Sequence, residues 1–160
     1  MHPHEPFIEQ AIALSQAAVA SGNHPFGALL VKDGAVILTA QNSVHTDHDP
    51  TRHAELNLVS QAARQFDPPT LAQCTLYTST EPCAMCTGAI VWGGIRRIVY
   101  ACSAETLGQI TGHVTFVVPS RTLLSYAHNP PEVVGPILEA QAAAVHWAYW
   151  PAYLSGSSSS

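Results

Sequence analysis

Apolar residues return at steps of three and four positions along two stretches in the first half of the chain. In residues 6–21 these positions are Phe7, Ile8, Ile12, Leu14, Ala18 and Val19. A second stretch covers residues 53–66 and stops at Pro68 and Pro69. Because an α-helix makes one turn in 3.6 residues, this spacing places the apolar side chains on one face. The pattern predicts two amphipathic helices.

Short apolar runs, which are typical of buried β-strands, occur between and after these helices. Residues 27–31 and 36–40 are joined by an Asp-Gly pair, which favours a tight hairpin turn. Residues 74–79 and 95–101 are two further runs, and a helix expected over residues 82–94 connects them. This order of elements predicts an α/β fold, with helices on both faces of a mixed sheet whose later strands are parallel.

The pattern weakens beyond Cys102. Residues 114–118 are a candidate fifth strand, and residues 131–147 are a candidate last helix. The apolar residues of that helix that we expect to face inward are Ile137, Leu138, Ala142 and Val145. The Trp and Tyr residues near the end of the chain could cover a pocket, contact a partner, or dock the helix on the core.

The composition fits one well-filled core, since 47% of the 160 residues are hydrophobic and 11% are charged. We expect a single domain over residues 1–154 and a disordered Ser-rich tail over residues 155–160. The formal net charge is −5, and no Lys or Arg follows Arg121, which argues against a nucleic-acid partner. No apolar run approaches the roughly 20 residues that span a bilayer. With no signal-peptide pattern at the start, we expect a soluble cytoplasmic protein.

The candidate chemistry lies in residues 53–55 (His-Ala-Glu) and 82–86 (Pro-Cys-Ala-Met-Cys). Cys83 and Cys86 are three residues apart, so both sulfurs lie on one face at the start of a helix. The positive end of the helix dipole favours the thiolate form there, and the thiolate is the form that binds zinc. Two thiolates and the His53 imidazole indicate zinc rather than magnesium or calcium. We assign Cys74 and Cys102 to the core.

His53 and Glu55 would point in roughly opposite directions on a regular helix. They can share a site only if it lies beyond the helix end, so we expect an ion in front of two helix N-termini. A structural zinc site closed by a fourth ligand, such as His45, His48 or Cys74, would give Glu55 no role. A redox Cys-x-x-Cys pair would explain neither His53 nor Glu55. His113, His128 and His146 lack the spacing of metal ligands.

These motifs resemble the cytidine-deaminase-like superfamily, in its branch of nucleobase and tRNA-adenosine deaminases. The resemblance covers roughly residues 24–101. It implies a three-layer α/β/α sandwich around a five-stranded mixed sheet, and a homodimer is the expected assembly. It also implies zinc held by His53, Cys83 and Cys86. Glu55 would carry the protons of a hydrolytic deamination that releases ammonia.

The resemblance further implies that the Asn42 side chain and the Ala54 backbone hold a small free nucleobase or nucleoside. Phe26 and Trp92 are candidates for the aromatic walls of its pocket.

Three substrate classes stay open. Residues 25–55 most resemble bacterial guanine deaminases, which favours a guanine-like purine, although residues 107–112 lack the acidic groups that those enzymes carry there and only Glu105 is near. Residues 86–90 resemble fungal cytosine deaminases. A tRNA adenosine deaminase usually ends in a basic helix, and this chain does not. The non-enzyme alternative is a zinc-bearing binding or assembly domain, but such a domain is expected to have lost Glu55 or a ligand.

Overall fold

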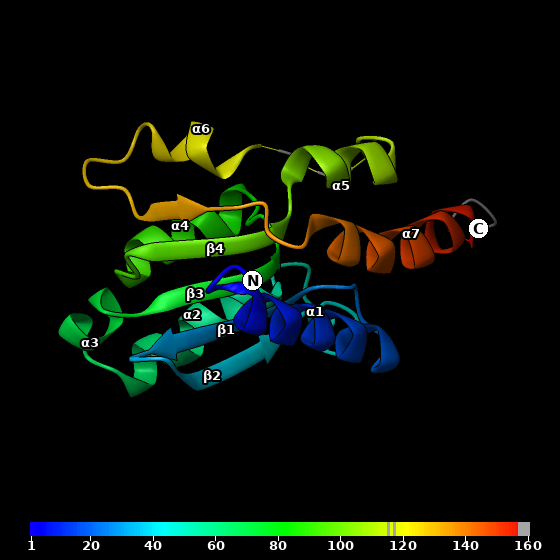
Figure 1. Ribbon diagram of the computed structural model, residues 1–160. Helices are drawn as coiled ribbons and strands as arrows, with labels where there is room; N and C mark the ends of the chain where they lie inside the picture. Colours follow the sequence, from blue (N-terminus) through cyan, green and yellow to red (C-terminus); the bar gives the residue numbers. More distant parts are fainter. Residues whose placement is uncertain (115, 117, 157–160) are drawn as a thin grey trace.

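A computed structural model describes residues 1–114, 116 and 118–156. Its elements in chain order are α1 (Glu5–Ala20), β1 (Gly27–Lys32), β2 (Ala35–Gln41), α2 (Ala54–Gln65), α3 (Pro68–Ala72), β3 (Thr75–Thr80), α4 (Ala84–Gly93), β4 (Arg97–Cys102), α5 (Ala104–Thr111), α6 (Ser120–Leu124), β5 (Glu132–Val134) and α7 (Glu139–Gly156). Figure 1 shows α1 and α7 next to each other on one side of the sheet. None of the described helices is both long and apolar enough to span a bilayer.

The strands form a five-stranded mixed sheet in the order β2-β1-β3-β4-β5. β1 runs antiparallel to β2 and β3, whereas β3, β4 and β5 are parallel to one another. The helices α4 and α5 each follow the carboxyl end of a parallel strand. Active sites of open α/β sheets lie at such strand ends, which is where the predicted metal ligands fall.

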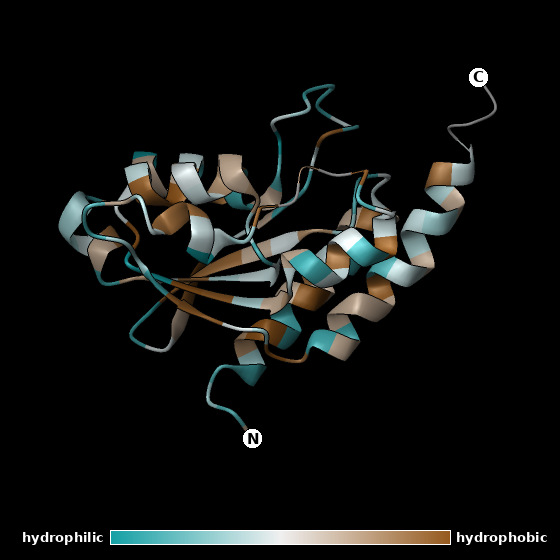
Figure 2. Ribbon diagram, turned by 90° about the horizontal axis from the view of Figure 1, so that it is seen from above, coloured by the Kyte–Doolittle hydropathy of each residue, from teal (hydrophilic) through white to brown (hydrophobic). Residues whose placement is uncertain are grey.

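Alternating residues of the strands belong to two apolar layers on opposite faces of the sheet. Figure 2 shows helices on both of these faces. Leu29 belongs to the layer that contains residues of α1, α5 and α7, and its neighbour Leu30 belongs to the layer that contains residues of α2, α3, α4 and α6. This alternation is the two-residue period of a strand buried on both faces. The predicted three-layer α/β/α sandwich is confirmed.

The fifth strand differs from the prediction. Val114, Phe116 and Val118 are not in a strand, and residues 115 and 117 lie outside the described residues. The sheet edge is completed instead by β5, whose Glu132 carboxylate accepts a hydrogen bond from Arg97 Nε at 2.8 Å.

The last helix also begins and ends later than predicted. Ile137 and Ala142 are buried, and Leu138 and Val145 pack on the same layer, but α7 starts only at Glu139. Ser155 and Gly156, expected in a disordered tail, form its last residues. Residues 157–160 of that predicted tail lie outside the described part of the chain.

Gly27 sets how closely α1 packs on the sheet. A Cβ built on Gly27 would lie 2.6 Å from the backbone nitrogen of Ser15 and would collide with the Leu14 side chain. Such distances are far below van der Waals contact, so only glycine fits at this crossing. The Gly27 N–H also donates to Ser79 Oγ at 3.1 Å. The start of β1, and with it Phe26, is therefore held firmly beside the end of β3.

Candidate active site

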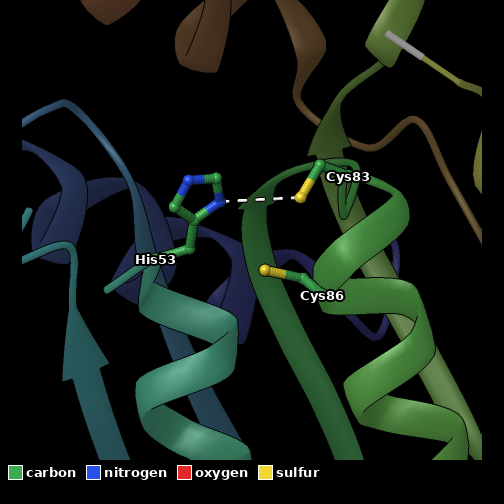
Figure 3. Close-up of side chains that lie close together, drawn as sticks. All are labelled: His53, Cys83 and Cys86. Atoms are coloured by element: carbon green, nitrogen blue, oxygen red, sulfur yellow. Dashed lines mark hydrogen bonds between the residues drawn. The ribbon is translucent and has the colours of Figure 1, made fainter. Parts of the chain in front are cut away.

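The predicted metal ligands stand at two helix N-termini that face the same space. His53 is the N-cap of α2 and Cys83 is the N-cap of α4, and both have extended backbone angles. The two helices lie side by side (Figure 3). Cys86 lies in the first turn of α4 and is buried. The arrangement confirms that the His53 and Cys83 motifs meet in front of helix ends.

The ligand atoms of His53, Cys83 and Cys86 all lie within 4.8 Å of one another. The Nδ1 atom of His53 is 3.5 Å from Cys83 Sγ. Two sulfurs and one imidazole nitrogen are a donor set that suits zinc. No other group of three His, Cys, Asp or Glu side chains is so placed among the described residues. A zinc ion held by these three side chains would still be able to bind a water molecule, as catalytic zinc sites do.

The surroundings favour an ionised sulfur at this site. The hydrogen bonds of Cys83 with Cys86 and with His53 lower the pKa of the Cys83 thiol to about 4. The N-terminus of α4 acts in the same direction, because its unpaired N–H groups stabilise negative charge. Cys83 is therefore a thiolate at neutral pH, ready to hold a metal ion.

Glu55 lies beside this group in the first turn of α2, and only 4% of its surface is exposed. Burial raises the pKa of its carboxyl group, and the charge of Cys83 adds to this effect. Thr78 Oγ1 donates a hydrogen bond to Glu55 Oε1 at 2.8 Å, which fixes the orientation of the carboxylate. A buried carboxyl group with a raised pKa is suited to accept and return a proton.

A cavity of about 420 Å³ opens next to the ligand group. It is lined by His24, Phe26, Asn42, Pro50, His53, Glu55, Glu81, Cys83, Met85, Leu107, Phe116 and Trp150. Most of these side chains are apolar or aromatic, and a few polar groups converge at the ligand end, which is typical of a small-molecule site.

Residues 1–102 match the family described as the cytidine and deoxycytidylate deaminase zinc-binding region. The chain belongs to this family of zinc-dependent deaminases. The predicted enzyme class and cofactor are thereby confirmed: the protein is an enzyme of hydrolytic deamination whose His53, Cys83 and Cys86 are placed to hold zinc.

Relatives of the deaminase carry different substrate names. A probable cytosine deaminase of Schizosaccharomyces pombe is 43% identical over 152 residues, which cover 90% of this chain and 90% of that protein. A guanine deaminase of Bacillus subtilis is 46% identical over 99 residues, or 61% of this chain and 64% of that protein. The solved guanine deaminase of Nitrosomonas europaea has a TM-score of 0.77 at 25% identity, over 90% of this chain and 82% of that chain.

The deaminase brings two of the predicted substrate residues to the cavity. Phe26 and Asn42 line it, and the Phe26 ring lies parallel to the His53 ring at 6.4 Å between centroids. Ala54 is fully buried at the start of α2, between His53 and Glu55, and a role for its backbone stays a prediction.

Trp92 does not line the cavity, and the prediction that it forms a wall is wrong for the described chain. It stands six residues beyond Cys86, almost two turns away from the N-terminus of α4 that carries the site. Its side chain is 93% exposed.

Several lining residues were missed by the sequence analysis, above all His24 and Trp150. Trp150 comes from α7, and the His24 ring stacks on it with 5.0 Å between centroids. His24 Nδ1 is 2.8 Å from the Tyr149 hydroxyl oxygen. Burial, with His45 and His53 nearby, lowers the pKa of His24 to about 4, so this wall is neutral at neutral pH. The aromatic cluster near the C-terminus was the only sequence signal for it.

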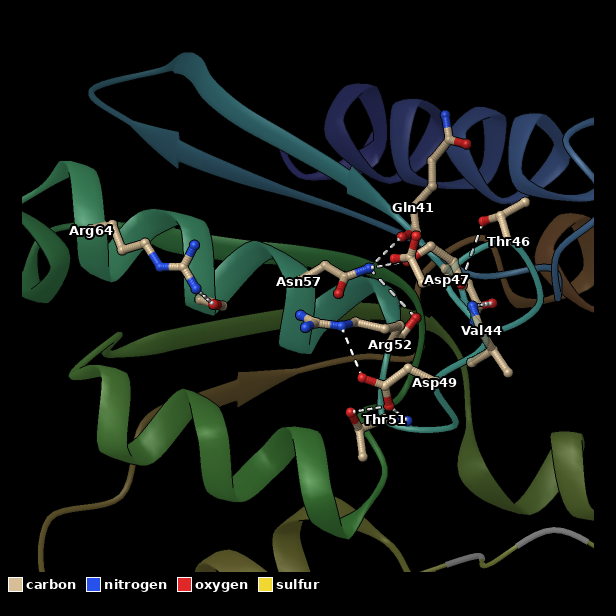
Figure 4. A network of polar contacts seen from close by, with 12 residues as sticks. Gln41, Val44, Thr46, Asp47, Asp49, Thr51, Arg52, Asn57 and Arg64 are labelled. Carbon is tan, nitrogen blue, oxygen red and sulfur yellow. Dashed lines mark hydrogen bonds and ion pairs between the residues drawn. The ribbon is translucent and has the colours of Figure 1, made fainter.

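The loop that carries Asn42 and leads to His53 is held by a polar network (Figure 4). Asn57 Nδ2 donates to the Gln41 carbonyl oxygen at 2.9 Å and to Ser43 Oγ at 3.0 Å. Asp49 pairs with Arg52 at 3.2 Å. These contacts join the end of β2 to the first turns of α2, so the positions of Asn42 and His53 depend on the same loop.

We expect the purified protein to carry about one zinc ion per chain, as a three-ligand catalytic site does. Cys86→Ser should lose most of this metal, because a hydroxyl group is a much poorer ligand than a thiolate. Elemental mass spectrometry of the wild-type protein and the variant after gel filtration measures the zinc content of each. Cys74→Ser, at a buried free cysteine outside the group, should keep its zinc. Full zinc in Cys86→Ser would contradict the assigned site.

Proposed function

We propose that this enzyme deaminates a small free nucleobase, with a cytosine-type pyrimidine as the best-supported substrate. The observation that carries the proposal is the position of Glu55, a buried carboxyl group that lines the cavity beside the three ligand side chains. Such a group can accept a proton from a water molecule on one side and donate it to a bound ring on the other.

Zinc at this site supplies the Lewis acidity that makes water a nucleophile near neutral pH. Glu55 accepts a proton from that water and passes it to the ring nitrogen next to the amine-bearing carbon, as the oxygen bonds to that carbon. Glu55 then moves the proton of the new hydroxyl group to the amine, which leaves as ammonia. One water molecule is consumed, and an oxo group replaces the amine.

Asn42 and the aromatic side chains would hold the base in place. Because Oδ1 of Asn42 accepts the N–H of Val44 at 3.1 Å, its Nδ2 is the atom that can donate to a carbonyl oxygen of the ring. Phe26 and Trp150 offer aromatic surface against which a flat ring can pack. A base whose carbonyl group is separated from its reacting carbon by one ring nitrogen, as in cytosine, fits these contacts.

The cavity favours cytosine over guanine through its supply of acceptors. Glu105, the acidic residue near residues 107–112, is exposed on α5 and is not among the described residues that line the cavity. The Glu81 carboxylate already accepts hydrogen bonds from Ala104 N at 2.8 Å and from Ser120 N and Oγ at 2.7 Å. A guanine base has two ring N–H groups and cytosine has one, so guanine would bury more unpaired donors here. A relative that matches 90% of this chain is also named a probable cytosine deaminase.

Guanine is the second candidate, since the relative with 46% identity over 99 residues is named a guanine deaminase. A tRNA substrate is not proposed, because α7 contains no Lys or Arg and the net charge is −5. We also propose that the enzyme is located in the cytoplasm, as expected from the sequence. The four free cysteines are compatible with this reducing compartment.

We also propose that the enzyme is a homodimer in which α4 contacts a second copy. This helix has no charged residue, and its outer side chains Val91 and Trp92 are 37% and 93% exposed. A helix on the surface of a monomer usually has a polar outer face. An exposed tryptophan at the end of an apolar helix is typical of a protein interface.

The substrate proposal predicts ammonia release from cytosine with a kcat/KM about tenfold or more above that for guanine. Adenine, cytidine and guanosine complete the panel, because they separate ring type from the presence of a sugar. Ammonia release is followed with a coupled assay, with and without a chelator. Faster turnover of guanine would contradict the cytosine proposal, and no release from any compound would contradict the enzyme's proposed substrate class.

Glu55→Gln should lower kcat by about 10²–10⁴-fold, because the amide cannot carry a proton between water and ring. Zinc content should stay at the wild-type level, since Glu55 is outside the ligand group. Glu105→Gln removes a carboxylate outside the cavity and should leave kcat unchanged. A zinc-loaded Glu55→Gln enzyme with a near-normal rate would refute the proton-carrying role.

The assembly proposal predicts that Trp92→Glu converts a dimer into a monomer, because it places a charge in an apolar contact. Sedimentation velocity gives the mass of each form. Trp147→Glu, at a tryptophan of α7 that is 57% exposed, should remain dimeric. A monomeric wild-type protein would rule out the dimer.

A further inference from the structure

We propose that His146 is a positioning residue whose imidazole, held as the Nε2–H tautomer between Thr80 and Trp150, fixes the indole wall of the substrate cavity. The inference rests on the proposed function, because the position of Trp150 affects turnover only if this cavity holds the base.

The hydrogen bonds of His146 determine where its proton lies. The Trp150 Nε1–H group donates to Nδ1 of His146 at 3.0 Å. An indole nitrogen is only a donor, so Nδ1 must be the acceptor and carry no proton. The ring proton of the neutral imidazole is then on Nε2, which lies 2.7 Å from Thr80 Oγ1 and donates to it.

The surroundings keep this imidazole neutral and in place. His146 is 1% exposed, and burial lowers its pKa to about 4. A protonated ring would place a second N–H group against the indole N–H, so the contact with Trp150 requires the neutral form. No buried side-chain nitrogen or oxygen atom in the described chain lacks a hydrogen-bond partner.

The contact joins α7 to the strand that leads into the metal site. His146 and Trp150 are four residues apart on α7 and therefore lie on one face of the helix. Thr80 is the last residue of β3, three positions before Cys83. The Phe26 ring lies 5.3 Å from the His146 ring and 6.2 Å from the Trp150 ring. Both aromatic walls of the cavity thus pack around one imidazole.

Loss of the acceptor would leave the indole N–H buried without a partner, which is unfavourable. The indole would have to turn toward water or toward another acceptor, and its face would no longer match the ring of the base. We expect the effect on substrate binding, and not on the chemical step, because neither His146 nor Trp150 belongs to the ligand group or carries the proton.

The test compares His146→Leu with His146→Asn, using the zinc-loaded full chain. Asparagine places its Oδ1 near the position of Nδ1 and can accept the indole N–H, whereas leucine cannot. We expect His146→Leu to raise KM for the substrate found in the panel about tenfold with a smaller change in kcat. His146→Asn should return KM to near the wild-type value. His128→Leu, at an exposed histidine, is the matched control.

The indole N–H signal in ¹⁵N–¹H spectra reports the contact directly. Trp150 is 6% exposed, while Trp92 and Trp147 are 93% and 57% exposed, so its signal should be the one most protected from exchange with water. Assignment uses Trp150→Phe. The signal should shift and lose protection in His146→Leu and stay close to wild type in His146→Asn.

An unchanged KM and an unchanged indole signal in His146→Leu would overturn the positioning role while leaving the deaminase proposal intact. If the leucine variant fails to fold, His146→Gln decides, because it can still reach Thr80 but lacks an acceptor at the Nδ1 position. It should raise KM as the leucine variant does, and a wild-type KM would overturn the role. Failure of the proposed function would instead show as no ammonia release from the wild-type enzyme.

Discussion

The site depends on the N-termini of α2 and α4, which lie side by side and face the same space. Each presents unpaired N–H groups and the positive end of a dipole to the same small volume. This field stabilises the Cys83 thiolate. The packing of the two helices brings Nδ1 of His53 to 3.5 Å from Sγ of Cys83, and these two residues are the N-caps. α2 packs on β1 and β2 and against α4, and α4 connects the parallel strands β3 and β4. The sheet therefore sets the position of the metal site.

A second requirement is the satisfaction of buried carboxyl groups around that site. Glu55 has a hydrogen bond from Thr78, and Glu81 accepts from the starts of both α5 and α6. A buried carboxylate without such partners would be very unfavourable. Glu81 thereby links the turn before Cys83 to two helices of the second half of the chain. The two carboxyl groups differ in use, because Glu81 is fully engaged by backbone and hydroxyl donors and Glu55 faces the ligand group.

The chemistry and the recognition of the base come from different parts of the chain. The family match ends at residue 102, and it contains the ligand group, Glu55 and Asn42. Leu107, Phe116 and Trp150, which close the cavity, all follow it. The relatives with different substrate names agree with this separation of the metal site, within residues 1–102, from side chains later in the chain. These three side chains can vary without removing a metal ligand, because none of them belongs to the ligand group.

The sequence by itself determined the elements and the reacting group. Hydrophobic periodicity predicted α1, α2, the hairpin and the β3-α4-β4 unit, since these are local patterns in which each residue's neighbours set its environment. The motif spacing predicted the ligand group and Glu55, because two cysteines three positions apart at the start of one helix and an N-cap histidine on another leave little geometric freedom. Tertiary structure alone decided the edge strand β5, the exposure of Trp92, and the place of His24, His146 and Trp150. The edge strand depends on pairing with β4, and the exposure of Trp92 depends on which elements pack against α4. The places of His24, His146 and Trp150 depend on how α7 packs, and a contact such as that between His24 and Trp150, more than a hundred positions apart, leaves no periodic trace in the chain.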